Sequence, residues 1–117
     1  MKAVNKGAKS VPNAQTVGIL PDASTSIAAD VDVAIITDMG EARNNVIVRS
    51  ANVVVACGSD DPGTASEIAL AIKAGVSVVL IGPSDRAAAF FASLDAQVEI
   101  ARSPADAIDL ILGKIPG

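Results

Sequence analysis

The sequence predicts an α/β fold in which a mostly parallel sheet carries helices on both faces, a three-layer α/β/α arrangement. Short apolar runs, such as Val53–Ala56 and Val78–Ile81, are typical of buried parallel strands. These runs alternate with segments of helical character, as in proteins built from strand–helix–strand units. Cap signals mark helix starts, because Ser84 precedes one helical segment and Ser103-Pro104 opens another.

Each predicted element follows from a local signal. Pro21 stops a strand, Gly75 ends a helix, and a strand ends before Gly82-Pro83. The predicted elements are a helix over 2–10, strands over 16–20 and 33–37, a helix over 41–51, a strand over 53–57, a helix over 64–74, a strand over 78–81, a helix over 84–93, a strand over 97–100 and a helix from 103 to 113. All of them fall in one predicted domain, residues 1–117.

The connection between the first two strands is unusual. The segment from Leu20 to Val33 is too short for the usual helical crossover between parallel strands. We therefore expect that these two strands either do not run parallel or are not neighbours in the sheet.

Composition excludes several classes of function. The net charge is −4 and no basic stripe occurs, which argues against nucleic-acid binding. No apolar run is long enough to span a membrane, and the first residues lack the apolar core of a signal peptide. The chain has no histidine, which excludes Ser-His-Asp and Cys-His catalysis and histidine-ligated zinc. Its one cysteine, Cys57, allows no internal disulfide and suits a reducing cytoplasm.

The most informative segment is 57–67, CGSDDPGTASE, which links a predicted strand to a predicted helix. Ligands of open parallel sheets bind where such loops leave the carboxyl ends of strands, and the start of a helix favours anions such as phosphate. The segment matches neither common nucleotide fingerprint. A purely structural interpretation is a capping box, in which Thr64 caps the helix and Glu67 reaches back to it.

Three blocks of sequence resemble the molybdenum-cofactor carrier proteins. The segment 62–67 resembles the P-G-T-x-x-E signature of that family, 39–44 with 48–51 resembles its M-G-x-x-R-N…S-[AS]-D segment, and 6–9 with 17–21 resembles its K-G-A-K…V-G-I-L-P run. The family belongs to the Rossmann-like superfamily of the Lonely Guy-type phosphoribohydrolases, often mislabelled lysine decarboxylases. The resemblance therefore implies a Rossmann-like fold, a small phosphorylated ligand and a homodimer or higher homo-oligomer.

Two departures from the family pattern affect function. The family loop is glycine-rich before P-G-T, whereas this chain has Ser59-Asp60-Asp61, and carboxylates oppose anion binding unless a cation intervenes. Relatives also open with a strand, a helix, a strand and a glycine-rich turn before K-G-A-K, so we expect the chain to lack the family's first strand–helix–strand.

The resemblance supplies a candidate ligand site. Its residues are Arg43, Asn44, Gly58, Ser59, Pro62, Gly63, Thr64 and Glu67. Arg43 follows a strand at a helix start, where a cation is disfavoured unless it serves an anion or pairs with Glu41 or Glu67. We predict that Arg43 and Glu67 lie within side-chain reach of each other. No metal site is expected, because two carboxylates alone do not define one.

Other residues are assigned to structure. Cys57 is predicted to be a small buried hydrophobe. Asp60 and Asp61 are predicted to form a polar loop tip. At least one of Phe90 and Phe91, the only aromatic residues, is expected in the core.

Three functions are consistent with these observations. The first, which we favour, is non-catalytic binding of a phosphorylated small molecule, either the molybdenum cofactor or a nucleotide. The second is a nucleotide 5′-monophosphate phosphoribohydrolase, with Glu67 assisting attack at the N-glycosidic carbon and Arg43 orienting the nucleotide. The third is an oligomeric fold that has lost ligand binding.

Overall fold

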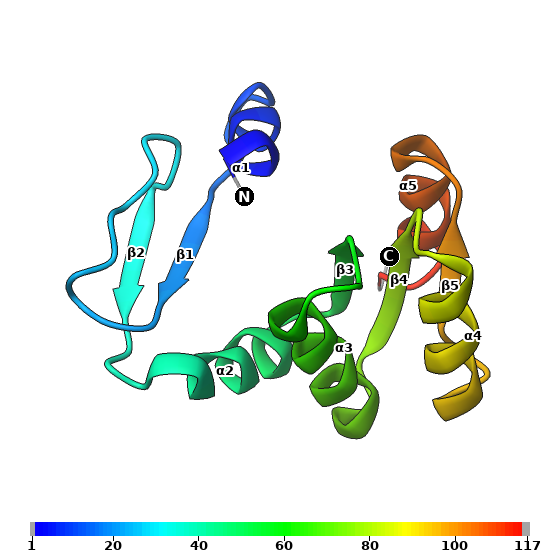
Figure 1. The fold of residues 1–117 in the computed structure, drawn as a ribbon. Coiled ribbons are helices and arrows are strands. Elements are labelled where there is room, and N and C mark those ends of the chain that lie inside the picture. Colours follow the sequence, from blue (N-terminus) through cyan, green and yellow to red (C-terminus); the bar gives the residue numbers. More distant parts are fainter. Residues whose placement is uncertain (1, 116–117) are drawn as a thin grey trace. The chain divides into compact units, whose positions relative to one another are not determined.

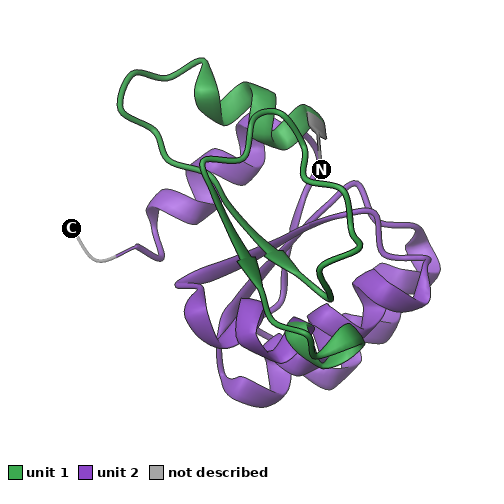
Figure 2. Ribbon diagram, turned by 90° about the vertical axis from the view of Figure 1, so that its left-hand side faces the viewer, with its two compact units in different colours: residues 1–43 green, residues 44–117 purple. Residues whose placement is uncertain are grey.

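A computed structural model describes residues 2–115 of the chain (Figure 1). Helices and strands alternate from residue 33 onward, and all strand pairs are parallel. The chain divides into two compact units, residues 1–43 and 44–117 (Figure 2). The expectation of a single domain over 1–117 stays a prediction. No helix in the described part of the chain is long and apolar enough to cross a membrane.

The first unit contains one helix and a two-stranded parallel sheet. Its elements are α1 (Lys2–Lys9), β1 (Val17–Leu20), β2 (Val33–Ile36) and the 3-10 helix η1 (Gly40–Ala42). The strands pair in register from Val17 with Val33 to Leu20 with Ile36. The expectation that these strands are not parallel or not neighbours was wrong. The irregular segment 21–32 makes the parallel crossover, because about a dozen residues suffice for it even without a helix.

Side-chain hydrogen bonds connect α1, the start of β1 and the segment before β2 in this unit. The Asp32 carboxylate accepts hydrogen bonds from the Lys9 ammonium and from the Thr16 backbone N–H, both at 2.9 Å. Those bonds lower the pKa of Asp32, with the Lys9 contact as the largest cause. Asp22 makes an Asx-type turn by accepting from the side chain and backbone N–H of Ser24, which lowers its pKa also. The crossover between the two strands is therefore shaped by side-chain hydrogen bonds.

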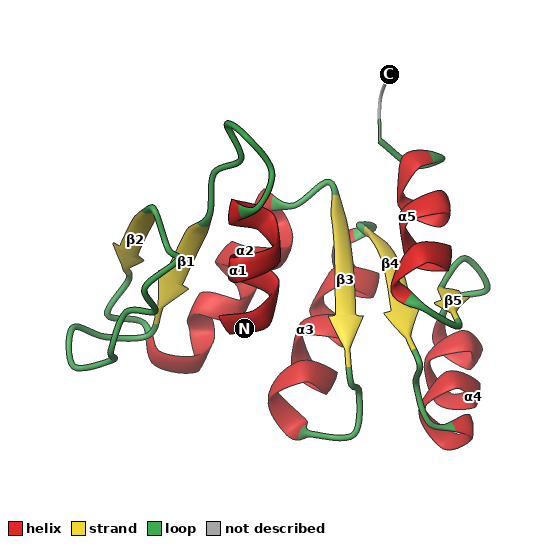
Figure 3. Ribbon diagram, turned by 90° about the horizontal axis from the view of Figure 1, so that it is seen from above, coloured by secondary structure: helices red, strands yellow, loops and turns green. Residues whose placement is uncertain are grey.

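The second unit is built on a three-stranded parallel sheet in the order β3-β4-β5 (Figure 3). Its strands pair from Val53 with Ser77 and from Val79 with Glu99. The elements are α2 (Arg43–Ser50), β3 (Val53–Cys57), α3 (Pro62–Ala74), β4 (Ser77–Ile81), α4 (Asp85–Leu94), β5 (Glu99–Ala101) and α5 (Pro104–Leu112).

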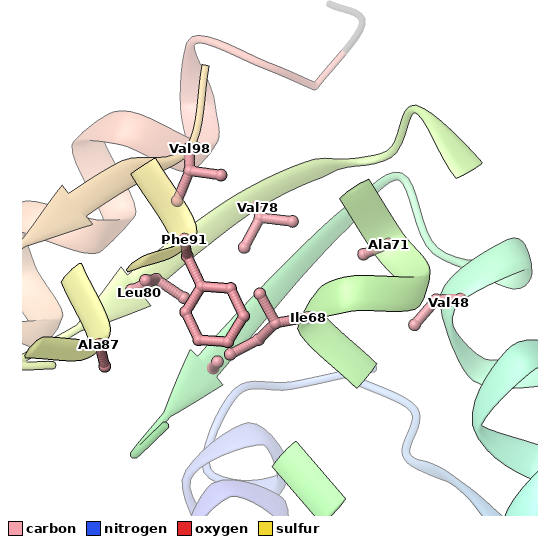
Figure 4. Packing of buried hydrophobic residues seen from close by; sticks show 9 residues of the cluster. Val48, Ile68, Ala71, Val78, Leu80, Ala87, Phe91 and Val98 are labelled. Atoms are coloured by element: carbon pink, nitrogen blue, oxygen red, sulfur yellow. The ribbon is translucent and has the colours of Figure 1, made fainter. Parts of the chain in front are cut away.

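The core of the second unit lies on both faces of the sheet. Side chains of a strand alternate between faces, so Val78 and Leu80 face one side and Val79 faces the other. The first side packs against Ile68 of α3 and Phe91 of α4 (Figure 4). Val79 packs with Ala101 and Ala107, the last of these from α5. The predicted three-layer α/β/α arrangement is thereby confirmed within residues 44–117.

Most sequence signals were confirmed. Ser84 and Ser103 are N-caps that accept from the N–H groups of Ala87 and Asp106. Gly75 ends α3 in the left-handed conformation, with φ of 75°. Phe91 is 3% exposed and Phe90 57%, so one of the two phenylalanines is in the core.

Candidate functional site

The β3–α3 loop begins with a turn that glycine makes easily. Gly58 follows the last residue of β3 and has φ of 95°, a conformation that side-chain-bearing residues rarely adopt. Ser59, Asp60 and Asp61 follow, and α3 begins at Pro62. The loop therefore leaves the carboxyl end of β3 and runs directly into a helix N-terminus, as the sequence predicted.

Asp61, rather than Thr64, caps this helix. The Asp61 backbone is extended, and its Oδ1 accepts a hydrogen bond of 2.9 Å from the Thr64 backbone N–H. The predicted capping box of Thr64 and Glu67 was wrong, because Pro62 starts the helix two residues before Thr64. The hydrogen bonds from Thr64 are the largest cause of a lowered Asp61 pKa. The start of α3 therefore already holds an anion of the chain itself.

A second loop meets the first at the same sheet edge. Gly82 follows β4 with φ of 55°, and Ser84 caps α4. The Ser84 hydroxyl donates a 2.9 Å hydrogen bond to Asp60 Oδ1 and accepts one of 3.1 Å from the Ala87 backbone N–H. Asp60, predicted as a polar loop tip, thus links the start of α4 to the β3–α3 loop.

An open groove of about 570 Å³ lies between these two loops and α4. Ser59 and Asp60 contribute from the β3–α3 loop, and Ser84, Arg86 and Phe90 from the start and outer face of α4. The sequence analysis did not assign Arg86 or Phe90 to a site. The available signal was their position two and six residues after Ser84, in the helix that follows the carboxyl end of the next strand.

Ser59 is the unusual residue of the groove. It is 7% exposed, and its Oγ has no hydrogen-bond partner among the described residues. A buried hydroxyl without a partner costs about 1–3 kcal/mol. This hydroxyl oxygen is enclosed by the protein, so its cost is borne by the fold of the β3–α3 loop.

The predicted site residues are only partly brought together. Gly58, Ser59, Pro62, Gly63 and Thr64 are contiguous at the start of α3, and Glu67 follows one turn later. A Cβ at Gly63 would stand 3.2 Å from Asp61 Oδ1, so glycine leaves room for the cap.

Asn44 lies beside this segment. It is 3% exposed, and its side-chain amide donates to Ser66 Oγ at 3.2 Å. Ser66 Oγ in turn donates to the Gly63 carbonyl. Asn44 is thus tied to the first turns of α3.

Arg43 is the first residue of α2 but the last residue of the first compact unit, so only residues 44–50 of that helix belong to the second unit. Its Nε donates a hydrogen bond of 3.2 Å to the Ile19 carbonyl at the end of β1. The pairing of Arg43 with Glu67 joins residues of two separate units, and it stays a prediction.

Cys57 was predicted to be buried, but it is exposed. Strand alternation explains the difference, because Cys57 shares a face with Val55 and lies opposite the buried Ala56. No group of three or more His, Cys, Asp or Glu side chains gathers within residues 2–115.

Comparisons with known proteins agree with one another. Residues 1–108 match the model of the SLOG cluster4 family. The molybdenum cofactor binding protein of Rippkaea orientalis superposes with a TM-score of 0.88 at 41% identity, over 97% of this chain and 69% of that one. The molybdenum cofactor carrier protein of Chlamydomonas reinhardtii gives a TM-score of 0.86 at 43% identity, with the same coverage.

A curated relative is an uncharacterised protein of Archaeoglobus fulgidus. It is 42% identical over 83 residues, which are 71% of this chain and 54% of that protein. The match thus spans about half the length of the relative. These similarities confirm the predicted Rossmann-like fold and the predicted resemblance of this chain to molybdenum-cofactor carrier proteins.

Proposed function

Since this chain belongs to the SLOG cluster4 family, we propose that it binds a small phosphorylated molecule of the molybdenum-cofactor kind without transforming it. The observation that carries this proposal is the groove at the carboxyl ends of β3 and β4, which Arg86 and Phe90 line beside the start of α4. Solved relatives of similar fold are named as molybdenum cofactor binding and carrier proteins.

We infer that the phosphoryl group binds on the α4 side of the β3–α3 loop. Asp61 already accepts from the Thr64 N–H, so an external anion at the first turn of α3 would compete with that carboxylate. Arg86 lines the groove beside the start of α4 and offers a guanidinium, which pairs well with phosphate. The proposed ligand-binding residues are Arg43, Asn44, Gly58, Ser59, Pro62, Gly63, Thr64 and Glu67, together with Arg86.

Binding without turnover is the expected behaviour. Hydrolysis at an anomeric carbon requires the phosphate and the base to be held in place, because positioning supplies much of the rate. The Asp61 carboxylate fills the position at α3 where a phosphate would be anchored. Glu67 and Arg43 are the residues that a phosphoribohydrolase would use.

The test is calorimetric titration of the protein with isolated molybdenum cofactor, under anaerobic conditions, and with AMP. We expect saturable binding of one of the two and no release of adenine from AMP. Arg86→Ala should weaken binding. Arg49→Ala is the matched control, because Arg49 lies near the end of α2, which leads into the amino end of β3.

Two results would contradict the proposal. The first is no binding of either compound. The second is steady release of adenine from AMP that is lost in Glu67→Gln, which would establish the phosphoribohydrolase instead.

We also propose that two copies of the chain associate. Ile108 and Leu112 are 54% and 67% exposed, and their spacing of four residues places them on one face of α5. Exposed apolar stripes of this kind are natural contacts between subunits, and two-fold dimers are the commonest closed assembly.

Light scattering should give twice the mass of one chain for the wild type. Leu112→Glu should give the mass of a monomer. A wild type that stays monomeric at high concentration would overturn this proposal.

A further inference from the structure

Phe90 carries an aromatic ring that is left largely uncovered on α4. Its side chain is 57% exposed, although the chain has only two aromatic residues and buries the other, Phe91. The two rings meet edge to face, with centroids 5.2 Å apart and planes inclined by 70°. In such a contact one ring presents its edge to the other, so at least one face of the Phe90 ring is not covered by Phe91. The buried ring therefore restrains Phe90 and leaves it a free face.

The Phe90 ring shares the groove beside α4 with a positive charge. Phe90 and Arg86 both line this groove. They are four residues apart on α4, a spacing that brings two side chains to one face of a helix, with Cβ atoms about 5–6 Å apart. The groove thus offers a guanidinium near the start of α4 and an aromatic ring one turn further along.

A cation followed by an aromatic ring suits a ligand that carries both a phosphate and a planar heterocycle. The guanidinium group binds phosphate oxygens through paired, charge-assisted hydrogen bonds. Aromatic side chains stack on heterocycles such as nucleobases, whatever the pattern of hydrogen-bonding groups at the edge of the base. A sugar phosphate without a heterocycle would pair with Arg86 in the same way, but it would gain nothing from Phe90.

We propose that Phe90 is the ring-binding residue of this groove: the heterocycle of the ligand stacks on its free face while the phosphate of the same ligand pairs with Arg86. This rests on the proposed function, since both groups belong to the ligand. It adds that the ligand is a heteroaromatic phosphate and that it lies along the first turns of α4. Phe90 then determines specificity, because it distinguishes ring-bearing phosphates from simple sugar phosphates.

The experiment compares ligands with and without a heterocycle by calorimetric titration. The ring-bearing ligands are AMP and isolated molybdenum cofactor, and the ring-free ligand is ribose 5-phosphate, which is AMP without its base. In the wild type we expect a ring-bearing ligand to bind about tenfold more tightly than ribose 5-phosphate, in line with one base stacked on an aromatic side chain. Phe90→Ala should abolish this preference by weakening the ring-bearing ligand about tenfold, with ribose 5-phosphate unchanged.

A second variant detects the stacking directly. The chain has no tryptophan and no tyrosine, so the indole introduced by Phe90→Trp is the only strong fluorophore. This variant keeps an aromatic face, and it should therefore keep the affinity of the wild type for the ring-bearing ligand. The indole emission should be quenched by that ligand and not by ribose 5-phosphate.

Leu94→Ala is the matched control. Leu94 is another exposed apolar side chain of α4, 51% exposed, and it lies outside the groove lining. Its replacement should change neither the affinities nor the mass in light scattering. Circular dichroism verifies that each variant is folded.

The possible contradictions separate this inference from the proposed function. Equal affinity of the wild type and Phe90→Ala for the ring-bearing ligand would overturn the inference and leave the proposed function standing. An equal loss for ribose 5-phosphate in Phe90→Ala would also overturn it, since the variant would then have distorted the groove. A lower mass of Phe90→Ala in light scattering would assign Phe90 to a contact between subunits instead. Absence of any binding of AMP and cofactor to the wild type would overturn the proposed function itself.

Discussion

The helices α3 and α4 cover the same face of the sheet and begin at the same edge, but they are capped by different chemistry. Asp61 caps α3 with a carboxylate, and Ser84 caps α4 with a neutral hydroxyl. The carboxylate at the start of α3 is the cap itself, whereas the start of α4 has Asp85 in its first turn and the Asp60 carboxylate on its cap hydroxyl, with Arg86 as the neighbouring cation. Both helix starts therefore carry negative charge from the chain, and Arg86 is what distinguishes the α4 side for an external anion.

The largest effect expected concerns how α4 is held on the sheet. Phe91 is 3% exposed and packs in the core, while its neighbour Phe90 is 57% exposed. Phe91→Ala should lower the free energy of unfolding by about 3–5 kcal/mol, the usual cost of removing a buried aromatic ring. Urea denaturation measures it.

Phe90→Ala is the matched control for that change. The two rings meet edge to face with centroids 5.2 Å apart. Such a pair contributes about 0.5–1.5 kcal/mol, so Phe90→Ala should cost no more than that. Equal costs for the two variants would mean that α4 does not pack on the sheet as described.

A smaller effect is expected from the neutral cap. Ser84→Ala removes the acceptor for the Ala87 N–H and the donor to Asp60. The free energy of unfolding should fall by about 0.5–2 kcal/mol, as for other lost N-caps. Ser93→Ala, near the other end of α4, serves as control, since its hydroxyl only donates to the Phe90 carbonyl of its own helix. If Ser93→Ala lowered the free energy of unfolding as much as Ser84→Ala, the cap would contribute no more to stability than any other serine of this helix.

Local sequence signals predicted the cap of α5 correctly but missed the cap of α3. Ser103-Pro104 was recognised as a cap followed by proline, and Ser103 does accept from the Asp106 N–H. Asp61-Pro62 is the same pattern, and Asp61 is the cap, whereas the prediction gave Thr64. The dipeptide Asp61-Pro62 alone is enough to predict the start of α3, because proline is favoured at the first helical position.

Other features depend on contacts that no local pattern contains. The bond from Ser84 to Asp60 joins residues 24 positions apart, and it requires β3 and β4 to be neighbours in register. The exposure of Cys57 depends on which face of β3 it occupies at the end of the strand. The alternation of strands and helices could be predicted from the sequence, whereas the groove arises from the pairing of strands.

The charge of the α3 cap should limit anion binding. Asp61→Ser keeps an oxygen that accepts from the Thr64 N–H but removes the negative charge. We expect the affinity for AMP, measured by calorimetry in EDTA, to rise by about threefold, in line with the effect of one charge near a helix terminus. Asp95→Ser, at the opposite end of α4, should leave the affinity unchanged. A weaker affinity in Asp61→Ser would show that Asp61 favours the ligand.

The smallest effect expected is a difference in pH dependence between the two caps. Hydrogen bonds from Thr64 lower the pKa of Asp61 below its ordinary value of 3.8, so the folded state binds this proton more weakly than the unfolded state. The stabilisation by Asp61 is therefore complete above the ordinary value and is lost as the pH falls through the lowered pKa. The Ser84 hydroxyl does not titrate in this range. Thermal unfolding between about pH 5 and pH 2 should show the wild type losing more stability than Asp61→Ser. Asp22 and Asp32, whose pKa values are also lowered, are present in both proteins and cancel in the comparison. Parallel curves for the two proteins down to the lowest pH would mean that Asp61 caps α3 without depending on its charge, and the contrast between the two helix starts would then rest on Arg86 alone.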